Sequence, residues 1–551
     1  MRMGRKMLAV GAAVLCPWSA AQAQDPLIRV DPSILSRTLP HPAAPQPITD
    51  PLVAAGPRTE QSEPRGPKPI ARSIVVQGAD EIGRDRFSSV LGSYRGRNLS
   101  TTDLKALTGA VADVARQAGY PFASASIEPQ TMADGALRVR LDAGTLSAVR
   151  VIGHPNTLAD RMLTRALVTG HPVRLEQLER AILLVGDIPG ITITESKYLR
   201  QDGFGILLVT IAEDRLNGYA QIDNRGSKEV GPIRATAIAN ARGLLQSGDE
   251  ASLLIANTPI HPAEFVFVRG RYTAPVDAKG STLSASASYG LANPGAALAP
   301  LDVTGKTYDA NLFYSRPMLR SRARSLWATV ELRGLRSRQS LLGFPLRDDA
   351  IATLTGALTG TMRAGSGIVR GGVRITEGLP LPGVSHEGDA RISRSDGDAR
   401  FVVVSYAAEW VAPLARRVSL ALASEAQIAS RPLLATMEIG VGGPGFGRGY
   451  DYAERTGDNG ILGSGEVRLD VVRLAPKIVD RVQIYGSVDG GYVGNLRDGP
   501  GGGALLSVST GVRAGRGRFS GALELAVPLN QDRFDTQNRD PRLSFRLSRV
   551  F

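Results

Sequence analysis

Hydrophobic and polar residues alternate along the chain from about residue 213 to residue 551, as in β-strands, whose successive side chains point to opposite faces. In the last stretch the two faces contain Leu543, Phe545, Leu547 and Phe551 against Arg542, Ser544, Arg546 and Ser548. Residues 326–335, 461–470 and 519–527 repeat this pattern, with charged residues on the second face. The last strand alone also fits a soluble sandwich. Because so many charged side chains would be costly in a dry core, the repeated pattern favours a barrel with lipid outside and water inside.

Gly, Pro and Asp residues divide this region into seventeen candidate strands. They begin near Tyr219, Ile233, Ala251, Glu264, Thr282, Tyr308, Leu326, Ala350, Gly367, Phe401, Val418, Leu434, Ile461, Val482, Ala504, Phe519 and Arg542. The candidate at Leu434 runs directly into Gly442-Gly443-Pro444-Gly445 and is therefore assigned to a loop. The sixteen that remain agree with the even strand numbers of bacterial barrels. We predict a transmembrane β-barrel of 16 antiparallel strands over residues 213–551.

Between residues 70 and 212, apolar residues recur at helical spacing between short strands. Residues 70–144 contain a predicted strand, two helices and two further strands, and the second helix carries the apolar face Leu104, Leu107, Val111, Val114 and Ala118. Residues 145–212 repeat the same order of elements. We predict two consecutive α+β domains of βααββ order, which form an internal repeat. A single α+β domain is the alternative interpretation.

The first 69 residues contain no such periodicity. Residues 1–23 have the features of a secretory signal peptide, namely three positive residues, a short apolar run and an A-x-A cleavage site. Residues 24–69 are Pro-rich and are expected to form an extended linker. Within this linker, Asp31 followed by Pro32 predicts the start of a short helix over residues 31–39.

Composition and charge narrow the possible functions. The chain has a net charge of +13, but its arginines are spread along the alternating strands, so nucleic-acid binding is not expected. The only cysteine, Cys16, lies in the predicted signal peptide, which excludes disulfides and cysteine-based zinc sites from the mature chain. The five histidines are far apart, and Pro444 prevents a helix after the glycine-rich segment 440–445, so neither a metal site nor a dinucleotide site is expected. We also find no catalytic constellation, and expect no enzyme activity and no cofactor.

Four short motifs follow one another in the second part of the chain. They are Asp223-Asn224-Arg225-Gly226-Ser227 with Gly231 and Gly248-Asp249, then Gly447-Arg448-Gly449-Tyr450, then Gly457-Asp458-Asn459-Gly460, and finally Gly486-Ser487-Val488-Asp489-Gly490-Gly491. Their order and spacing resemble the outer-membrane transporters of two-partner secretion, the TpsB or haemolysin secretion/activation family of the POTRA-barrel translocase superfamily. The resemblance covers residues 70–551 and implies that the two α+β domains are POTRA domains.

The resemblance implies a site inside the barrel. Counting strands places Arg448 in the sixth extracellular loop, residues 431–460, and Asp489 on the lumen face of the thirteenth strand. The family folds this loop back into the barrel, where the planar fork of an arginine can bind a carboxylate. The alternative is that Arg448 is an ordinary solvated loop residue. The expected site residues are Arg448, Gly449, Tyr450 and Asp489 for the loop–barrel contact, and Asp223, Asn224 and Gly226 for the barrel opening.

The resemblance also implies a function. We expect a passive translocator in the outer membrane whose periplasmic POTRA domains bind an unfolded exoprotein of haemolysin, haemagglutinin or adhesin type. Such a client would add to an exposed sheet edge. The expected edge residues are Ala123, Ser124, Ala125, Ser126 and Ile127 in the first domain, and Ile191, Thr192, Ile193 and Thr194 in the second. The other expected partners are outer-membrane lipid and, during biogenesis, the barrel-assembly machinery.

Two other functions are open at this point. One is a factor of the same superfamily that inserts or assembles outer-membrane proteins, although two domains and a long Pro-rich segment favour secretion. The other is a diffusion porin with a periplasmic appendage, which no loop would close. In related pores a helix ahead of the POTRA domains plugs the lumen, and here only residues 31–39 can serve.

Overall fold

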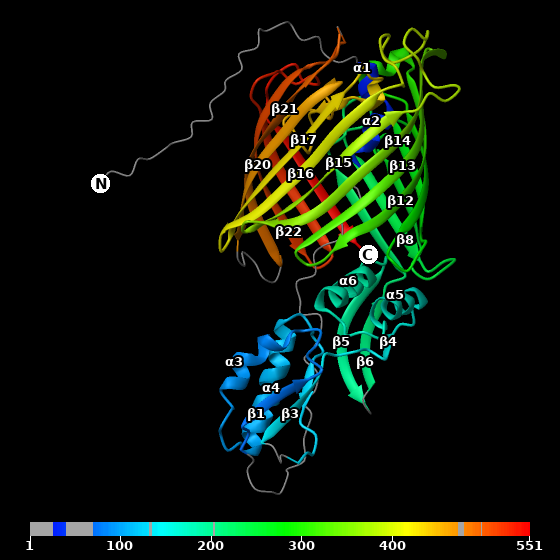
Figure 1. Cartoon of the computed structure of the whole chain (residues 1–551). Helices are drawn as coiled ribbons and strands as arrows, with labels where there is room; N and C mark the ends of the chain where they lie inside the picture. Colours follow the sequence, from blue (N-terminus) through cyan, green and yellow to red (C-terminus); the bar gives the residue numbers. More distant parts are fainter. Residues whose placement is uncertain (1–25, 40–69, 132–134, 202–203, 472–478, 498) are drawn as a thin grey trace.

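The computed structural model describes residues 26–39, 70–131, 135–201, 204–471, 479–497 and 499–551. They form a closed barrel, two small α+β domains at one of its ends, and a short helical segment within the barrel towards its other end (Figure 1). No helix in these ranges is long and apolar enough to cross a membrane. The predicted signal peptide and residues 40–69 of the Pro-rich segment lie outside the described residues.

Sixteen strands form the barrel, which confirms the predicted strand number. They are β7 (Leu216–Asp223), β8 (Arg234–Arg242), β9 (Glu250–Asn257), β10 (Phe265–Pro275), β11 (Thr282–Ala292), β12 (Thr304–Arg320), β13 (Arg324–Leu341), β14 (Phe344–Ala364), β15 (Gly367–Gly378), β16 (Val402–Ala415), β17 (Val418–Ala429), β20 (Asn459–Val471), β21 (Arg481–Gly494), β22 (Gly503–Arg516), β23 (Phe519–Pro528) and β24 (Arg542–Val550). All neighbours are antiparallel. The largest shift is at β14, which begins six residues before its predicted start because polar residues there obscure the alternation.

The wall of the barrel has the two faces that the alternation predicted. Leu543 and Leu547 of β24 are exposed on the outside, whereas Arg542 and Ser544 are buried on the inside. An apolar outer surface and a polar interior are typical of a barrel that lies in lipid.

The barrel closes along a short seam between its last and first strands. Only five residue pairs, from Arg546–Asp223 to Val550–Tyr219, join β24 to β7, whereas eight join β7 to β8. We call this β24–β7 junction the seam.

The candidate strand at Leu434 lies in a loop, and a short strand follows it. The loop between β17 and β20 contains η4 (Ala435–Met437), β18 (Ile439–Val441) and β19 (Arg455–Gly457). β18 and β19 pair with each other in a separate two-stranded sheet and are not part of the barrel.

The first α+β domain consists of β1 (Ser73–Gln77), η2 (Arg84–Phe87), α3 (Ser88–Gly92), α4 (Thr101–Gln117), β2 (Ser124–Ser126) and β3 (Ala136–Asp142). A capping box fixes the start of α4, because the Asp103 amide donates to Ser100 Oγ and the Ser100 amide donates to the Asp103 carboxylate. The apolar face of α4 packs on the sheet around Phe87, Leu107 and Val139. The sheet order is β1-β3-β2, so β2 is an edge strand.

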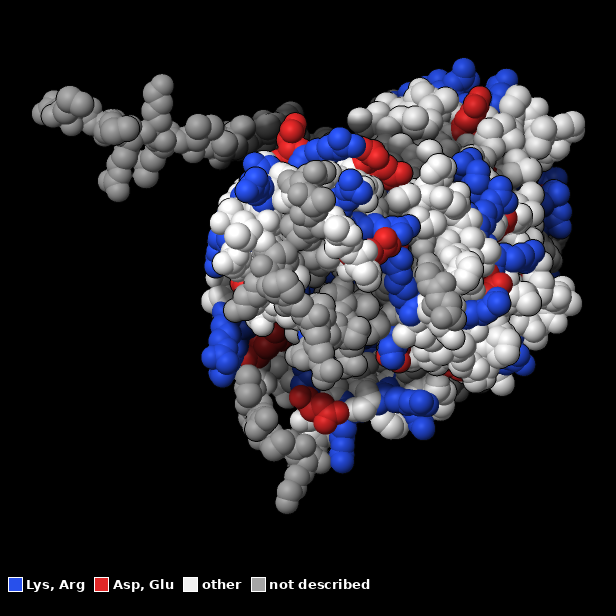
Figure 2. Space-filling view, turned by 60° about the horizontal axis from the view of Figure 1, so that its bottom comes forward, with Lys and Arg blue, Asp and Glu red and all other residues white. Residues whose placement is uncertain are grey.

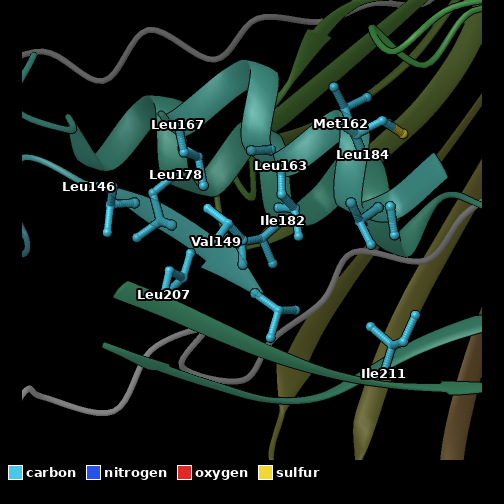
Figure 3. Close-up of a cluster of buried hydrophobic side chains, with 14 of the residues drawn as sticks. Leu146, Val149, Met162, Leu163, Leu167, Leu178, Ile182, Leu184, Leu207 and Ile211 are labelled. Carbon is cyan, nitrogen blue, oxygen red and sulfur yellow. The ribbon is translucent and has the colours of Figure 1, made fainter. Parts of the chain in front are cut away.

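The second α+β domain repeats this order with β4 (Ala148–Gly153), α5 (Thr157–Leu167), α6 (Leu175–Gly186), β5 (Ile191–Gln201) and β6 (Phe204–Glu213). Leu163 and Leu178 of the two helices point at Val149 and Leu207 of the sheet, and together they form the core in Figure 3. The sheet order β4-β6-β5 makes β5 an edge strand. β5 extends beyond the predicted segment to Gln201, because a bulge at Thr194 interrupts its alternation.

Residues 26–39 form the helical segment within the barrel, with α1 (Pro26–Arg29), α2 (Pro32–Leu35) and η1 (Ser36–Thr38). The Asp31 side chain accepts a hydrogen bond of 2.8 Å from the Ser33 amide and so caps α2, as the sequence predicts. The sequence pattern predicted a helix only over residues 31–39, so α1 was not expected.

Basic side chains are spread over the surface at the end of the molecule that carries the α+β domains, with acidic side chains between them (Figure 2). No single basic patch dominates this view, in contrast to the clustered charge of a nucleic-acid interface.

Candidate functional site in the barrel lumen and at its entrance

The loop of residues 431–460 is anchored to the inside of the barrel wall through Tyr450. This side chain is fully buried, and its hydroxyl donates to Asn530 Oδ1 at 3.0 Å. Its backbone oxygen accepts a hydrogen bond of 2.9 Å from Arg542 of β24. The loop therefore contacts β24, one of the two strands of the seam, and the residues that follow β23.

Arg448 lies among three acidic side chains of the wall. Its Nη1 atom is 2.8 Å from Glu466 Oε2 and 3.2 Å from Glu524 Oε2. Its Nε atom is 3.5 Å from Asp489 Oδ2, which is an ionic contact without a hydrogen bond. The structure thus brings Arg448 and Asp489 together, but the shortest contact of the guanidinium is with Glu466.

The Asp489 carboxylate binds mainly the backbone of the loop. Its Oδ1 atom accepts hydrogen bonds from the amides of Gly447, at 2.7 Å, and Arg448, at 2.8 Å. Ser507 donates to the same oxygen at 2.8 Å. This carboxylate therefore fixes the path of the chain at the motif, while Glu466 and Glu524 fix the arginine side chain.

Two glycines of the motif are required by this close packing. Gly447 has a φ of +86°, a left-handed conformation that L side chains rarely adopt. A Cβ atom on Gly449 would lie 2.9 Å from the backbone nitrogen of Pro528. The loop approaches β23 at a distance that only glycine allows.

A second buried ionic cluster surrounds Arg394, in the loop between β15 and β16. Its Nη1 atom is 2.9 Å from Asp458 Oδ2 and 3.2 Å from Glu438 Oε1, and both acids belong to the 431–460 loop. Burial raises the pKa of Glu438 to about 7. Arg394 was not singled out in the sequence, and Asp458 was named there only as part of the motif Gly457-Asp458-Asn459-Gly460. Besides the ion pair, the Asp458 carboxylate accepts hydrogen bonds from the amides of Leu433 and Leu496.

Residues 26–39 are held against the same loop. Arg29 Nη2 is 3.1 Å from Asp451 Oδ2, and Asp451 Oδ1 accepts a hydrogen bond of 2.6 Å from Arg542. Arg37 donates to the backbone oxygens of Thr436 and Glu438. One acidic loop residue, Asp451, therefore connects the N-terminal segment with the last strand.

The barrel wall packs closely against residues 26–39. Pro32 packs on Gly290 of β11 and Gly305 of β12, and a Cβ atom at Gly290 would lie 2.6 Å from Pro32 Cβ. Val30 and Leu39 join a buried cluster with Phe265 and Phe267 of β10. Apolar packing, close approach and ion pairs together hold residues 26–39 in the lumen.

The opening motif lies at the seam. Asp223 Oδ1 accepts hydrogen bonds from the guanidinium of Arg234, at 3.0 Å, and from the Arg225 amide, at 2.8 Å. Asn224 bridges to β24, since its Nδ2 donates to the Leu543 oxygen at 2.9 Å and its Oδ1 accepts from the Phe545 amide at 2.7 Å. The Asn224 side chain thus adds two hydrogen bonds to β24 beyond the last backbone pair of the seam.

Gly226 makes this opening turn possible. A Cβ atom there would lie 1.9 Å from the Gly231 oxygen. Both glycines belong to the motif singled out in the sequence.

The two expected edges lie close to each other where the α+β domains meet. In the first domain β2 comprises Ser124–Ser126, while Ala123 and Ile127 flank it. Arg200, near the end of β5, donates to Ser124 Oγ at 2.8 Å and forms an ion pair with Asp142. Tyr198 of β5 stacks on Phe122 with ring centroids 4.5 Å apart. The far end of one edge strand therefore contacts the start of the other.

The near end of β5 lies at the mouth of the barrel. Ile191 follows Gly190, whose oxygen accepts the Asp214 amide at 2.9 Å. The Asp214 oxygen accepts a hydrogen bond of 2.9 Å from Arg242, the last residue of β8. The edge strand β5 thus extends from the domain junction to the barrel entrance.

A bidentate ion pair fixes the second domain to this entrance. Both carboxylate oxygens of Asp187, which follows α6, lie 2.7 Å from the Arg320 guanidinium at the end of β12. Arg180 of α6 donates to the Pro317 oxygen at 2.9 Å and the Met318 oxygen at 3.3 Å. None of these contacts is predictable from the sequence, because nothing in the local pattern shows which barrel turn faces which helix.

Comparisons with known proteins identify the family that this chain resembles. The family described as haemolysin secretion/activation protein ShlB/FhaC/HecB matches residues 205–514, and the ShlB-type POTRA domain matches residues 70–144. The outer membrane transporter CdiB of Escherichia coli O6:K15:H31 (strain 536 / UPEC) is 24% identical over 94% of this chain and 88% of its own length. The heme/hemopexin transporter protein HuxB of Haemophilus influenzae (strain 86-028NP) is 23% identical over 49% of this chain. That match spans about half of the relative, 48% of its length.

Solved structures show the same fold. CdiB from Escherichia coli superposes with a TM-score of 0.67 at 20% identity, covering 90% of this chain and 94% of that chain. CdiB from Acinetobacter baumannii gives a TM-score of 0.62 at 18% identity, covering 94% and 96%. Because the family match includes more than half of the chain, it establishes both the family and the cellular location of the protein. The chain belongs to the haemolysin secretion/activation family ShlB/FhaC/HecB, with its barrel in the outer membrane and its POTRA domains in the periplasm.

Proposed function

We propose that this protein is the outer-membrane translocator of a two-partner secretion system, which binds an unfolded exoprotein in the periplasm and exports it through the barrel. The observation that carries the proposal is the position of β5. This edge strand of eleven residues extends from the β2 edge at Arg200 to the barrel mouth at Arg242. At about 3.3 Å per residue it spans roughly 36 Å.

An unfolded client can use such an edge because pairing is made through the backbone. A client strand added to β5 would be aligned with the entrance. β5 lies at the edge of its sheet, and Thr192, Thr194 and Lys197 are exposed along it. The names of the two relatives, a heme/hemopexin transporter protein and an outer membrane transporter, support transport as the common activity. The proposal assigns no catalytic step to the chain.

Two further partners belong to this proposal. The exposed leucines of the outer wall would contact outer-membrane lipid. The barrel would be inserted by the barrel-assembly machinery during biogenesis.

Site-directed crosslinking tests the edge. Cysteine at Thr192, on the β5 edge, is compared with cysteine at Arg150, an exposed residue of β4 at the opposite edge of the same sheet. The wild-type chain has its only cysteine in the predicted signal peptide, so each variant carries one new thiol. The probe is the secretion segment of a candidate exoprotein, sought first in the adjacent reading frame. We expect crosslinks at Thr192→Cys; equal crosslinking at both positions would contradict edge addition.

A further inference from the structure

The outer wall carries an unusual row of residues at the periplasmic end of the seam. Residues directly opposite each other in paired strands share a face, and the pairs here connect β22, β23, β24, β7, β8 and β9. The row consists of Arg516, Phe519, Arg549, Ala220, Ala237 and Ile255. Phe519, Leu523 and Leu525 are exposed on this face, so it is the outside of the barrel. Two arginines thus project from an otherwise apolar wall.

These arginines have no acidic partner among the described residues. Arg549 is held instead between two aromatic rings, with its guanidinium carbon 4.8 Å from the Phe519 centroid and 4.5 Å from the Phe551 centroid. Arg516 lies across from Phe519, and both arginines are exposed. The nearby carboxylate of Asp480 accepts the Gly517 amide at 2.6 Å and so binds the turn. The positive charge of both guanidinium groups remains available to a ligand.

An apolar recess of about 650 Å³ lies beside these arginines, and both are part of its lining. The recess forms where small residues line the wall, namely Ala220, Ala235, Ala237 and Gly521. The larger side chains of Ile222 and Leu547 project outward beside them. The recess is open along the wall rather than enclosed. The recess extends over both strands of the seam, so an occupant would contact β24 and β7 together.

We propose that this face binds a phospholipid with an anionic headgroup, its phosphate between Arg516 and Arg549 and an acyl chain in the recess across the seam. The two arginines are two strands apart, roughly 10 Å, a distance that their side chains close around one phosphate. Arginine binds phosphate oxygens in a bidentate way. An apolar recess joined to a cationic rim matches the two ends of a lipid, whereas a free anion would leave the recess unfilled. Export through the lumen requires no such site, so the inference goes beyond the proposed function.

Native mass spectrometry of the purified full chain tests the site. The protein in detergent is mixed with phosphatidylglycerol or with phosphatidylcholine, and the retained lipid is measured. We expect wild type to retain phosphatidylglycerol preferentially, and Arg516→Gln/Arg549→Gln to lower this retention about tenfold, equivalent to about 1.4 kcal/mol. The matched control is Arg416→Gln/Arg417→Gln, two exposed arginines in the turn between β16 and β17. We expect this control to retain the lipid like wild type.

A second variant tests the recess without changing charge. Ala237→Leu places a larger side chain in the recess from the exposed face of β8, and is expected to lower phosphatidylglycerol retention. Migration of unheated samples on gels reports whether each barrel is folded. Equal retention of the two lipids by wild type would overturn the proposal. An equal loss in the Arg416→Gln/Arg417→Gln control, or no loss in Ala237→Leu, would also overturn it, since each would show only general attraction to anionic lipid.

Discussion

At the scale of single residues, Arg448 connects the 431–460 loop with the wall. Its guanidinium contacts Glu466, Glu524 and Asp489 and is largely buried. Removing one partner of a buried ion pair typically costs about 3–5 kcal/mol, and less where water enters. We therefore propose that the position of the loop, rather than the stability of the barrel, depends on this residue.

Arg448→Ala is expected to lower export of the client several-fold, while the barrel still inserts. The measure is exoprotein in the medium, normalised to the amount of folded barrel. Arg468→Ala is the matched control, because Arg468 binds the same Glu466, at 2.6 Å, but belongs to the wall. Undiminished export by Arg448→Ala at equal barrel levels would show that the contact has no role in transport.

The sequence indicated part of this site. Arg448 and Asp489 were found because each lies in a recognisable motif, and alternation placed Asp489 on the inner face. Glu466 and Glu524 also lie on polar faces, but their convergence on one arginine depends on the stagger of strands across the barrel. Arg394 lies in a loop without any periodicity, so its burial with Asp458 could not be predicted.

At the scale of elements, the segment of residues 26–39 blocks part of the lumen. The Asp31–Pro32 pair predicted its helix correctly, since a cap is a local signal. The family resemblance had pointed to the lumen as its place, but its contacts there were not predictable, because Arg29 meets Asp451 more than four hundred positions along the chain. The segment has two short helices and few internal contacts, so its order depends on the barrel that surrounds it.

Deleting residues 26–39 is expected to raise the conductance of the barrel in planar bilayers, because it removes apolar and ionic contacts from the lumen. A deletion of equal length within residues 40–69 is the control for linker length and should leave the conductance near that of wild type. Asp451→Asn, which weakens the Arg29 contact without shortening the chain, should give more frequent openings. If the deletion leaves the current unchanged, the remaining loops alone close the pore.

At the scale of the whole molecule, the fold was predictable and the arrangement of its parts was not. Alternation gave sixteen strands, and helical spacing gave two α+β domains, because both depend on local periodicity. How the second domain sits on the barrel depends on Asp187 and Arg320, one hundred and thirty-three positions apart. Such a contact has no sequence signature. It nevertheless sets the direction of β5 towards the entrance.

Arg320→Gln therefore tests whether this direction matters. The Arg320 side chain is only 4% exposed and binds both oxygens of Asp187, and hydrogen bonds to charged groups are worth about 1.5–3 kcal/mol. We expect spin labels on α6 and on β12 to report a broader range of distances, and export to fall. Arg336→Gln is the matched control, since Arg336 forms the same bidentate pair with Asp348 but is 47% exposed and far from the entrance. A narrow, unchanged distance distribution with reduced export would assign Arg320 to contact with the client. Broad distances with normal export would show that export does not depend on a fixed orientation of β5 at the entrance.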